Sequence, residues 1–196
     1  SHRLIIAGNT VYGTKKKHGI IISREVNDSW IFNNRSYDNE LSGIVIDRTS
    51  INNVIANNET YRNKSDGITI YESGQNLLWG NKAFNNGRHG IRVRNSAEVD
   101  LYENLAVANG LLGIYGHIKD LNGTDRDLAL DPFDMNLSLT VVGGRLVGNQ
   151  TGAISVMGPQ SVKLYQLDML MPAKPTGVGM FGALADGKNQ ILDLMI

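Results

Sequence analysis

Hydrophobic and polar positions alternate in short runs, and these runs return at a regular interval along the first part of the chain. The clearest unit is a glycine followed by isoleucine, any residue, and isoleucine or valine, as at Gly19–Ile22 and Gly43–Ile46. The unit returns at Gly67 and Gly90, and a weaker copy begins at Gly113. A fixed period in the twenties predicts a solenoid in which each repeat stacks on the preceding one.

Two series of asparagines keep the same interval as the glycines. The first series follows short apolar runs and comprises Asn9, Asn33, Asn57, Asn81 and Asn104. The second series comprises Asn39, Asn63, Asn86 and Asn109. Asparagine tolerates left-handed backbone geometry at a bend, and identical amide side chains that stack can hydrogen-bond along the stack. The two series therefore predict two corners in each coil.

Each coil then consists of short strands between corners. Aliphatic residues such as Ile20, Ile22, Ile44 and Ile46 alternate with residues on the opposite face, which is the pattern of a strand with one buried side. We predict an all-β fold, a right-handed parallel β-helix with about 23–24 residues per coil. A leucine-rich repeat has a similar period, but it needs a regular leucine series and usually a helical arc, and the sequence has neither.

The period ends near residue 118, and the rest of the chain is less regular. We expect coils over residues 1–118, an irregular loop over 119–136, and final strands with an irregular C-terminal cap over 137–196. The apolar residues of 189–196 are spaced as in a helix but stop early, so we predict a truncated helix there. We expect one domain that is truncated at both ends, because Leu4–Asn9 opens on the second strand of a coil.

Charge and composition narrow the range of partners. The formal net charge is zero, but the first 24 residues contain five basic side chains and no acidic one, which suits a polyanion. The chain has no cysteine, so it has neither a disulfide framework nor a cysteine zinc site. It has no nucleotide-binding or metalloprotease motif and no apolar run of membrane-spanning length. We expect no cofactor, no metal, no nucleic-acid partner and no membrane span.

One outward face of the coils carries titratable and aromatic residues. The fourth residue after each repeated glycine points outward, and this column comprises Ser23, Asp47, Tyr71, Arg94 and His117. The neighbouring column and the strand entrances and exits add Lys17, His18, Arg48, Arg88, His89 and Arg92. A face that only covers the core would carry small polar residues, so we predict that these residues bind an extended acidic glycan. The run Lys15–Lys17 is equally consistent with a solvated turn, and the histidines at strand entrances with corner residues that bond to the backbone.

Four stretches resemble the periplasmic mannuronan C5-epimerases of alginate-producing bacteria. They are Val11–Val26, Leu77–Asn81, Arg88–Ser96 and Tyr115–Leu121. The resemblance implies a β-helix that inverts C5 of D-mannuronate residues within the polymer to give L-guluronate, without a metal. It also implies a periplasmic location, alginate (polymannuronate) as the substrate, and other proteins of an alginate secretion complex as partners.

The resemblance further implies which residues act. The family's arginine that neutralises the uronate carboxylate matches Arg24. The family removes H5 with the histidine of an Asp-Pro-His-Asp motif, which is absent from this sequence and is expected before Ser1; His2 lacks the Asp-Pro context. A guanidinium can bind a carboxylate through two hydrogen bonds and offset the charge that develops as H5 leaves. The sequence does not identify the group that returns a proton to the opposite face.

Three functions stay open at this point. An epimerase would remove H5 and return a proton on the other side of the ring. A β-helix polysaccharide lyase shares carboxylate neutralisation and H5 removal, but it then expels the 4-linked sugar. A non-catalytic glycan-binding or capping solenoid needs no base at all.

Overall fold

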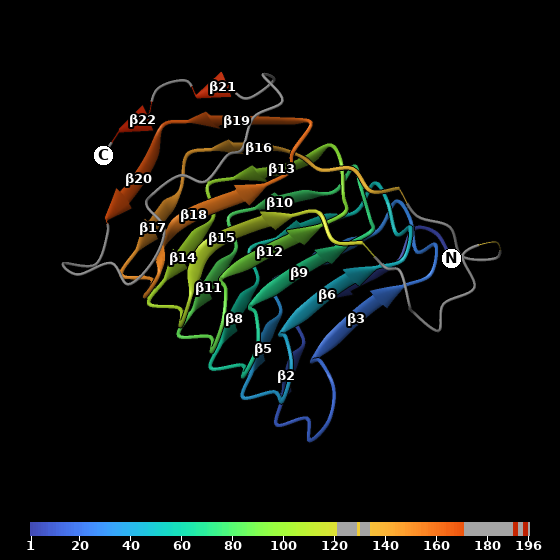
Figure 1. Ribbon diagram of the computed structural model, residues 1–196. Helices are drawn as coiled ribbons and strands as arrows, with labels where there is room; N and C mark the ends of the chain where they lie inside the picture. Colours follow the sequence, from blue (N-terminus) through green and yellow to red (C-terminus); the bar gives the residue numbers. More distant parts are fainter. Residues whose placement is uncertain (121–128, 130–133, 171–189, 192–193, 196) are drawn as a thin grey trace.

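The computed structural model describes residues 1–120, 129, 134–170, 190–191 and 194–195. Within these residues, strands from successive coils lie side by side and form one stacked column (Figure 1). Each of the first six coils contributes one strand to each of three sheets, and the strand pairs are parallel. The predicted parallel β-helix is therefore confirmed.

Sheets 1 and 2 run the length of the column, and sheet 3 covers its first six coils. Sheet 1 contains β1 (Ile5–Ala7), β4 (Trp30–Phe32), β7 (Val54–Ala56), β10 (Leu77–Trp79), β13 (Val99–Tyr102), β16 (Ser138–Val142), β19 (Ser161–Tyr165) and β21 (Gln190–Ile191). Sheet 2 contains β2 (Thr10–Tyr12), β5 (Arg35–Tyr37), β8 (Glu59–Tyr61), β11 (Lys82–Phe84), β14 (Leu105–Val107), β17 (Arg145–Val147), β20 (Leu167–Leu170) and β22 (Leu194–Met195). Sheet 3 contains β3 (Ile20–Ser23), β6 (Ile44–Asp47), β9 (Ile68–Tyr71), β12 (Ile91–Arg94), β15 (Leu112–His117) and β18 (Gly152–Met157).

Aliphatic side chains from all three sheets fill the interior. Ile44 and Ile46 of sheet 3 have no exposed surface, and neither have Ile31 and Ile55 of sheet 1. Burying one such side chain contributes roughly 1.5–3 kcal/mol, so the repeated coils accumulate a continuous core. The alternation seen in the Gly-Ile repeat is thus the alternation between core and outer face.

The repeated glycines stand where the coils approach each other most closely. A Cβ atom on Gly67 would lie 2.6 Å from the carbonyl oxygen of Gly90 and 2.7 Å from the hydroxyl of Thr60. Any side chain at this position would have to displace the backbone of the next coil. The glycine marks the sequence period because the stacking distance leaves no space there.

The second asparagine series forms the predicted ladder of amide hydrogen bonds. The Nδ2 atoms of Asn39, Asn63 and Asn86 each donate to Oδ1 of the asparagine in the next coil, at 2.9, 3.0 and 3.1 Å. Asn109 continues the ladder to Asn149 at 2.9 Å. The ladder therefore crosses the irregular segment that interrupts the sequence period.

The prediction of the first asparagine series is correct at three positions and wrong at two. The ladder between sheets 1 and 2 consists of Asn9, Asn34, Asn58, Asn81 and Asn104, with Nδ2 to Oδ1 distances of 2.9–3.0 Å. Asn33 and Asn57 precede the ladder residues and have φ angles of 54° and 52°. In these Asn-Asn pairs, the first residue makes the left-handed bend and the second makes the hydrogen bonds, so spacing alone does not separate them.

A third corner, between sheets 3 and 1, was missed, so the prediction of two corners per coil is incomplete. The backbone N–H of Ser29 donates to Oδ1 of Asn53 at 2.9 Å, and that of Asn53 donates to Asn76 at 2.8 Å. Ser73 and Ser96 form a parallel series of acceptors beside them. The serine series Ser50, Ser73 and Ser96 keeps an interval of 23 residues, so a repeated marker of this corner was present in the sequence and was overlooked.

The C-terminal part differs from the expectation at one point. β15 ends at His117 and β16 begins at Ser138; most of the loop assigned to 119–136 lies outside the described residues, as does the cap over 171–189. The helix predicted over 189–196 is wrong, because this range contains β21 and β22, which pair with β19 and β20. The open edges of those two strands offer unpaired backbone groups, and pairing with them satisfies a short apolar segment better than two turns of helix.

Within the part of the chain that the structure describes, no helix has the length and apolar character needed to cross a membrane.

Candidate glycan-binding face

The outer face of sheet 3 brings the predicted residues into two columns. Pairing of β3, β6, β9, β12 and β15 aligns one column in the order Ser23, Asp47, Tyr71, Arg94 and His117. The same pairing aligns the other column in the order Ile21, Val45, Thr69, Arg92 and Tyr115. Because stacked strands are about 4.8 Å apart, neighbouring side chains of a column are in contact range.

Arg92 is fixed from several sides. Its Nη1 atom lies 3.5 Å from the Asp66 carboxylate, which has no exposed surface, and its Nε–H donates to Nε2 of His117 at 3.1 Å. The guanidinium also lies over the rings of Tyr71 and Tyr115, at 5.4 and 5.9 Å from their centroids. An arginine held in this way keeps its remaining N–H groups in a constant direction, which favours binding of a planar carboxylate.

Arg94 is held by a second carboxylate. Its Nη2 donates to Glu72 at 2.9 Å, and its guanidinium lies 4.1 Å from the centroid of the Tyr71 ring. Burial raises the pKa of Asp47 in the same column, and the nearby Glu72 carboxylate raises it further. This middle part of the face therefore combines two held arginines with carboxylates that neutralise much of their charge.

The N-terminal end of the face has a different character. Arg24 follows β3 with a left-handed φ of 63°, and its side chain is exposed, as is that of Lys17. Among the described residues, the Arg24 side chain has no hydrogen bond or ion pair. Arg48, one coil further, lies 3.7 Å from the Asp47 carboxylate. Arg24 is thus exposed for an incoming anion, whereas the arginine of the next coil already has an acidic neighbour.

The histidines at the strand entrances bond to the backbone, which was one of the two interpretations left open. Nδ1 of His18 accepts the N–H of Ser42 at 3.0 Å, and Nδ1 of His89 accepts the N–H of Leu112 at 3.3 Å. A neutral imidazole that accepts at Nδ1 carries its proton on Nε2. Both rings therefore also have a donor available for a ligand, so the structural and binding roles are compatible.

Burial keeps the histidines of this face neutral. Burial, followed by the positive charge of Arg92, lowers the pKa of His89 from 6.5 to about 3 and the pKa of His117 from 6.5 to about 4. The rings of both histidines stack on Tyr115, at 4.6 and 4.5 Å between centroids. The positive charge of the face at neutral pH therefore comes from arginine and lysine.

The neutral histidines predict a pH dependence of stability. Between about pH 6.5 and pH 4, the unfolded chain binds protons at His89 and His117 that the folded chain does not bind, so the free energy of unfolding falls as the pH falls. Replacing both by glutamine is expected to flatten this dependence, measured as denaturant midpoints at pH 7 and pH 5. The exposed His2→Gln variant serves as the control, and an unchanged slope in the double variant would contradict the prediction.

The predicted residues form two groups rather than one cluster. The first group lies at the N-terminal end and comprises Lys17, His18, Ser23 and Arg24. The second lies around β9, β12 and β15 and comprises Tyr71, Arg88, His89, Arg92, Arg94 and His117, with Asp47 and Arg48 between the groups. The prediction missed Asp66 and Glu72, the two carboxylates that hold the arginines. Asp66 precedes a repeated glycine, as His18 and His89 do, and this shared position was a signal in the sequence that Asp66 belongs to the same face.

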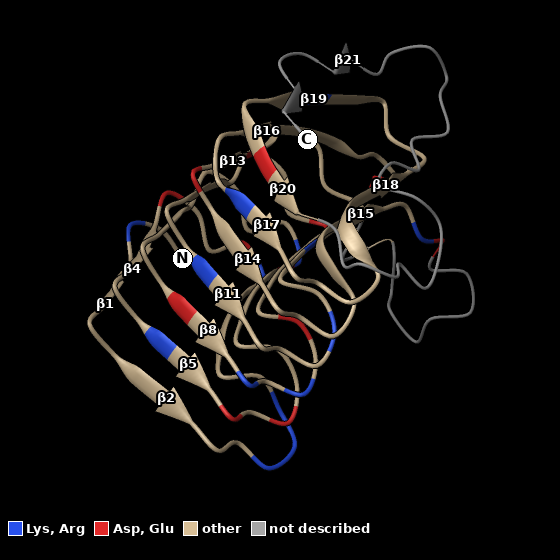
Figure 2. Cartoon of the chain, turned by 90° about the vertical axis from the view of Figure 1, so that its left-hand side faces the viewer, with Lys and Arg blue, Asp and Glu red and all other residues tan. Residues whose placement is uncertain are grey.

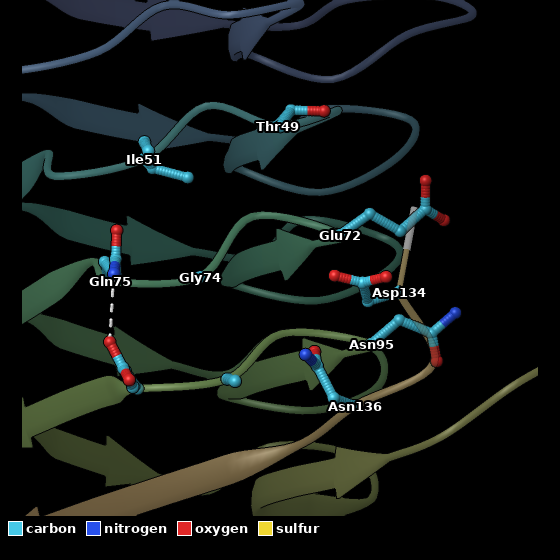
Figure 3. Close-up of a pocket in the computed structure, with 10 residues that line it drawn as sticks. Thr49, Ile51, Glu72, Gly74, Gln75, Asn95, Asp134 and Asn136 are labelled. Carbon is cyan, nitrogen blue, oxygen red and sulfur yellow. Dashed lines mark hydrogen bonds between the residues drawn. The ribbon is translucent and has the colours of Figure 1, made fainter. Parts of the chain in front are cut away.

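A cavity of about 420 Å³ lies beside the face, at the corner between sheets 3 and 1 (Figure 3). Glu72, Glu98 and Asp134 line it together with amide side chains such as Gln75, which donates to Glu98 at 3.0 Å. Three carboxylates in one cavity repel an anionic polymer. The open face of sheet 3 therefore suits a polyuronate better than this cavity does.

The described residues contain no group of three or more His, Cys, Asp or Glu side chains arranged to hold a metal ion.

Comparison with known proteins agrees with the fold and with the resemblance. Residues 1–115 match the family model described as periplasmic copper-binding protein (NosD). The chain is 66% identical over 196 residues to a mannuronan C5-epimerase of Pseudomonas putida and 64% identical to one of Pseudomonas aeruginosa. It covers 38% and 36% of those two proteins, so it spans well under half the length of the curated relatives it matches.

The solved structures include a similar fold at high sequence identity. The crystal structure of the periplasmic alginate epimerase AlgG superposes with a TM-score of 0.84 and 63% identity, over 87% of this chain and 40% of that chain. The resemblance to mannuronan C5-epimerases seen in the sequence is thereby confirmed, and the match over residues 1–115 shows that the chain belongs to the NosD family.

Proposed function

We propose that the outer face of sheet 3 binds a polyuronate chain and that this chain is part of a mannuronan C5-epimerase. The observation that carries the proposal is the placement of arginines on one face. Arg24 is exposed at one end, while Arg92 and Arg94 are held by carboxylates three strands away. Relatives named mannuronan C5-epimerase, at 61–66% identity over the whole chain, support it. A periplasmic location and contacts with other proteins of an alginate secretion complex belong to the same proposal.

In this proposal, Arg24 supplies the charge that the reaction needs. The proton on C5 is only weakly acidic, because its removal places negative charge next to a carboxylate. A guanidinium bound to that carboxylate offsets the charge as it develops, and such electrostatic stabilisation is often the largest single contribution to catalysis. Inversion is completed when an acid or water returns a proton to the opposite face of the ring. The exposed position of Arg24, to which no carboxylate of the described residues is bound, supports this role.

The second group of residues holds sugars away from the reacting one. Three strand spacings separate β3 from β12, which is about 14 Å along the column. An extended polysaccharide that follows the column passes Asp47 and Tyr71 before it reaches Arg92. Neutral His89, which accepts a hydrogen bond at Nδ1, can donate one from Nε2 to a sugar hydroxyl without adding charge.

The decisive experiment uses the longer protein, meaning this chain extended to the length of its relatives. Incubation with polymannuronate is expected to give guluronate signals in the NMR spectrum. Unsaturated sugar ends that absorb in the ultraviolet would identify a lyase instead. The absence of both products would indicate a non-catalytic glycan-binding solenoid. The 196-residue chain alone is expected to give neither product, because the histidine motif that the family uses is not in its sequence. Turnover by the purified chain, with contaminating enzyme excluded, would contradict the expectation that the 196-residue chain alone is inactive.

Binding by the second group is expected to depend on oligomer length. Replacing the exposed Arg88 by glutamine is expected to weaken binding of long mannuronate oligomers and to reduce its salt dependence, because exposed charge contacts with a polyanion are screened by salt. Affinity for the shortest oligomers should hardly change. Titration calorimetry at two salt concentrations measures both effects, with Lys82→Gln on sheet 2 as the matched control.

Equal losses for short and long oligomers would place the second group next to the reacting sugar. A folding defect would produce the same equal losses, and a circular dichroism melt of the variant distinguishes the two explanations.

A further inference from the structure

Sheet 1 has an outer face that is entirely apolar over its first four strands. The outward residues of β1, β4, β7 and β10 are Ile5, Ala7, Trp30, Phe32, Val54, Ala56, Leu77 and Trp79. Ile5 is 73% exposed, Trp30 is 52% exposed and Trp79 is 54% exposed. These four strands contain no charged residue. We call this surface the apolar face of sheet 1.

In the same coils, the outer face of sheet 2 carries charged residues. There the outward column of Arg35, Glu59 and Lys82 alternates in charge, and Glu59 pairs with both neighbours at 3.3 Å. Figure 2 shows these charged positions in blue and red along β5, β8 and β11. The aromatic residues of sheet 2 stack on one another, with Tyr37 and Tyr61 4.8 Å apart between centroids. Sheet 2 therefore has the charges expected of a surface that faces water, and the apolar face of sheet 1 does not.

The border of the apolar face towards sheet 2 is also uncharged. The bends that follow β4, β7 and β10 are made by Asn33, Asn57 and Gly80. A polyuronate would find no cation here, so this surface is unsuited to the polymer proposed for sheet 3. Contiguous exposed apolar surface of this kind marks a site of contact with protein or membrane, and the absence of basic residues argues against an anionic membrane surface.

The size of the face limits what can cover it. Four strands span roughly 19 Å along the column, and three residues span roughly 10 Å across it. Two copies that met through this face alone would bury well under the roughly 1,200 Å² typical of a stable complex between separate proteins. An α-helix is about 10–12 Å in diameter and rises about 1.5 Å per residue, so one helix of about 13 residues matches both dimensions.

We propose that an amphipathic helix from another part of the same polypeptide, outside residues 1–196, packs on the apolar face of sheet 1. The chain covers 36–38% of its relatives, so more than half of each relative lies outside the matched region and can provide such a segment. A tethered segment acts at an effective concentration in the millimolar range, which allows a contact too small for free partners to persist. This inference concerns assembly of the protein and does not depend on the function proposed for sheet 3.

Photo-crosslinking in the longer protein tests the proposal directly. A benzophenone amino acid replaces Val54 at the centre of the apolar face, and the same amino acid replaces Glu59 on sheet 2 as the matched control. The expected result is an intramolecular crosslink from position 54 to one peptide outside residues 1–196, identified by mass spectrometry, and no such crosslink from position 59. Crosslinks only between two chains, only to a different protein, or only within residues 1–196 would overturn the proposal.

Tryptophan emission provides a second measurement that does not depend on crosslinking chemistry. The difference between the emission spectra of the longer protein and its Trp79→Phe variant isolates the signal of Trp79. If a helix covers the face, this signal is blue-shifted and resists quenching by acrylamide. A red-shifted signal that acrylamide quenches as readily as free tryptophan would show that the face is open to solvent and would overturn the proposal.

Discussion

Replacement of Arg24 by alanine in the longer protein is expected to lower the rate of mannuronate epimerisation on the order of 10²–10³-fold, because one charge-stabilising donor typically contributes that much. Arg24 is exposed, so its removal leaves no buried charge without a partner and the fold should stay intact. The rate is measured by NMR as guluronate formed from polymannuronate under saturating substrate. A loss of less than about threefold would remove Arg24 from the mechanism.

Two further variants make this result specific. Arg24→Lys keeps the charge but loses the planar pair of donors, so it should recover only part of the rate. Arg35→Ala on sheet 2 removes an exposed arginine of the next coil that pairs with Glu59, and it should leave the rate unchanged. If Arg35→Ala lost as much as Arg24→Ala, the effect would reflect general attraction of the polyanion and not neutralisation at the reacting sugar.

The fold could be predicted in detail because its strongest constraints repeat along the sequence. The close approach at Gly67 allows only glycine, and the amide ladder through Asn63 and Asn86 requires asparagine in every coil, so both leave a period in the sequence. At the corner between sheets 3 and 1, one series changes residue type, because the acceptor is the Ser29 hydroxyl in one coil and the Asn53 amide oxygen in the next. The other series of this corner, Ser50, Ser73 and Ser96, does keep the period, but serine is common in turns, so three copies were not recognised as a corner.

The outward columns could be predicted for the same reason, but the contacts across them could not. The period places Arg92 and Arg94 on the outer face of sheet 3, as the structure has them. It does not show that Asp66 and Glu72, which enter and leave the preceding strand, turn back to pair with those arginines. Such pairs depend on side-chain direction across neighbouring coils, which the repeat does not encode. The helix predicted for the short segment 189–196 was wrong because helical spacing and strand pairing compete closely at that length.

Asp66 is expected to be the most sensitive residue of this face for stability. It has no exposed surface, it lies 3.5 Å from Arg92, and it accepts the backbone N–H of His89 at 3.1 Å. Asp66→Ala leaves a mostly buried guanidinium without its carboxylate and a buried N–H without an acceptor. Losing one member of such a pair is strongly destabilising, so we expect a loss of about 3 kcal/mol in the free energy of unfolding.

Denaturant titration of three variants separates the causes of that loss. Asp66→Asn keeps an oxygen for the N–H of His89 but removes the charge, so it should lose less than Asp66→Ala. Asp38→Ala breaks an exposed pair in which Arg62 donates twice at 2.7 and 2.8 Å, and solvent screening should make its effect far smaller despite the shorter distances. If Asp66→Ala and Asp38→Ala cost the same, burial would not govern these pairs, and Arg92 would not be held in the fixed orientation on which the binding proposed for the second group depends.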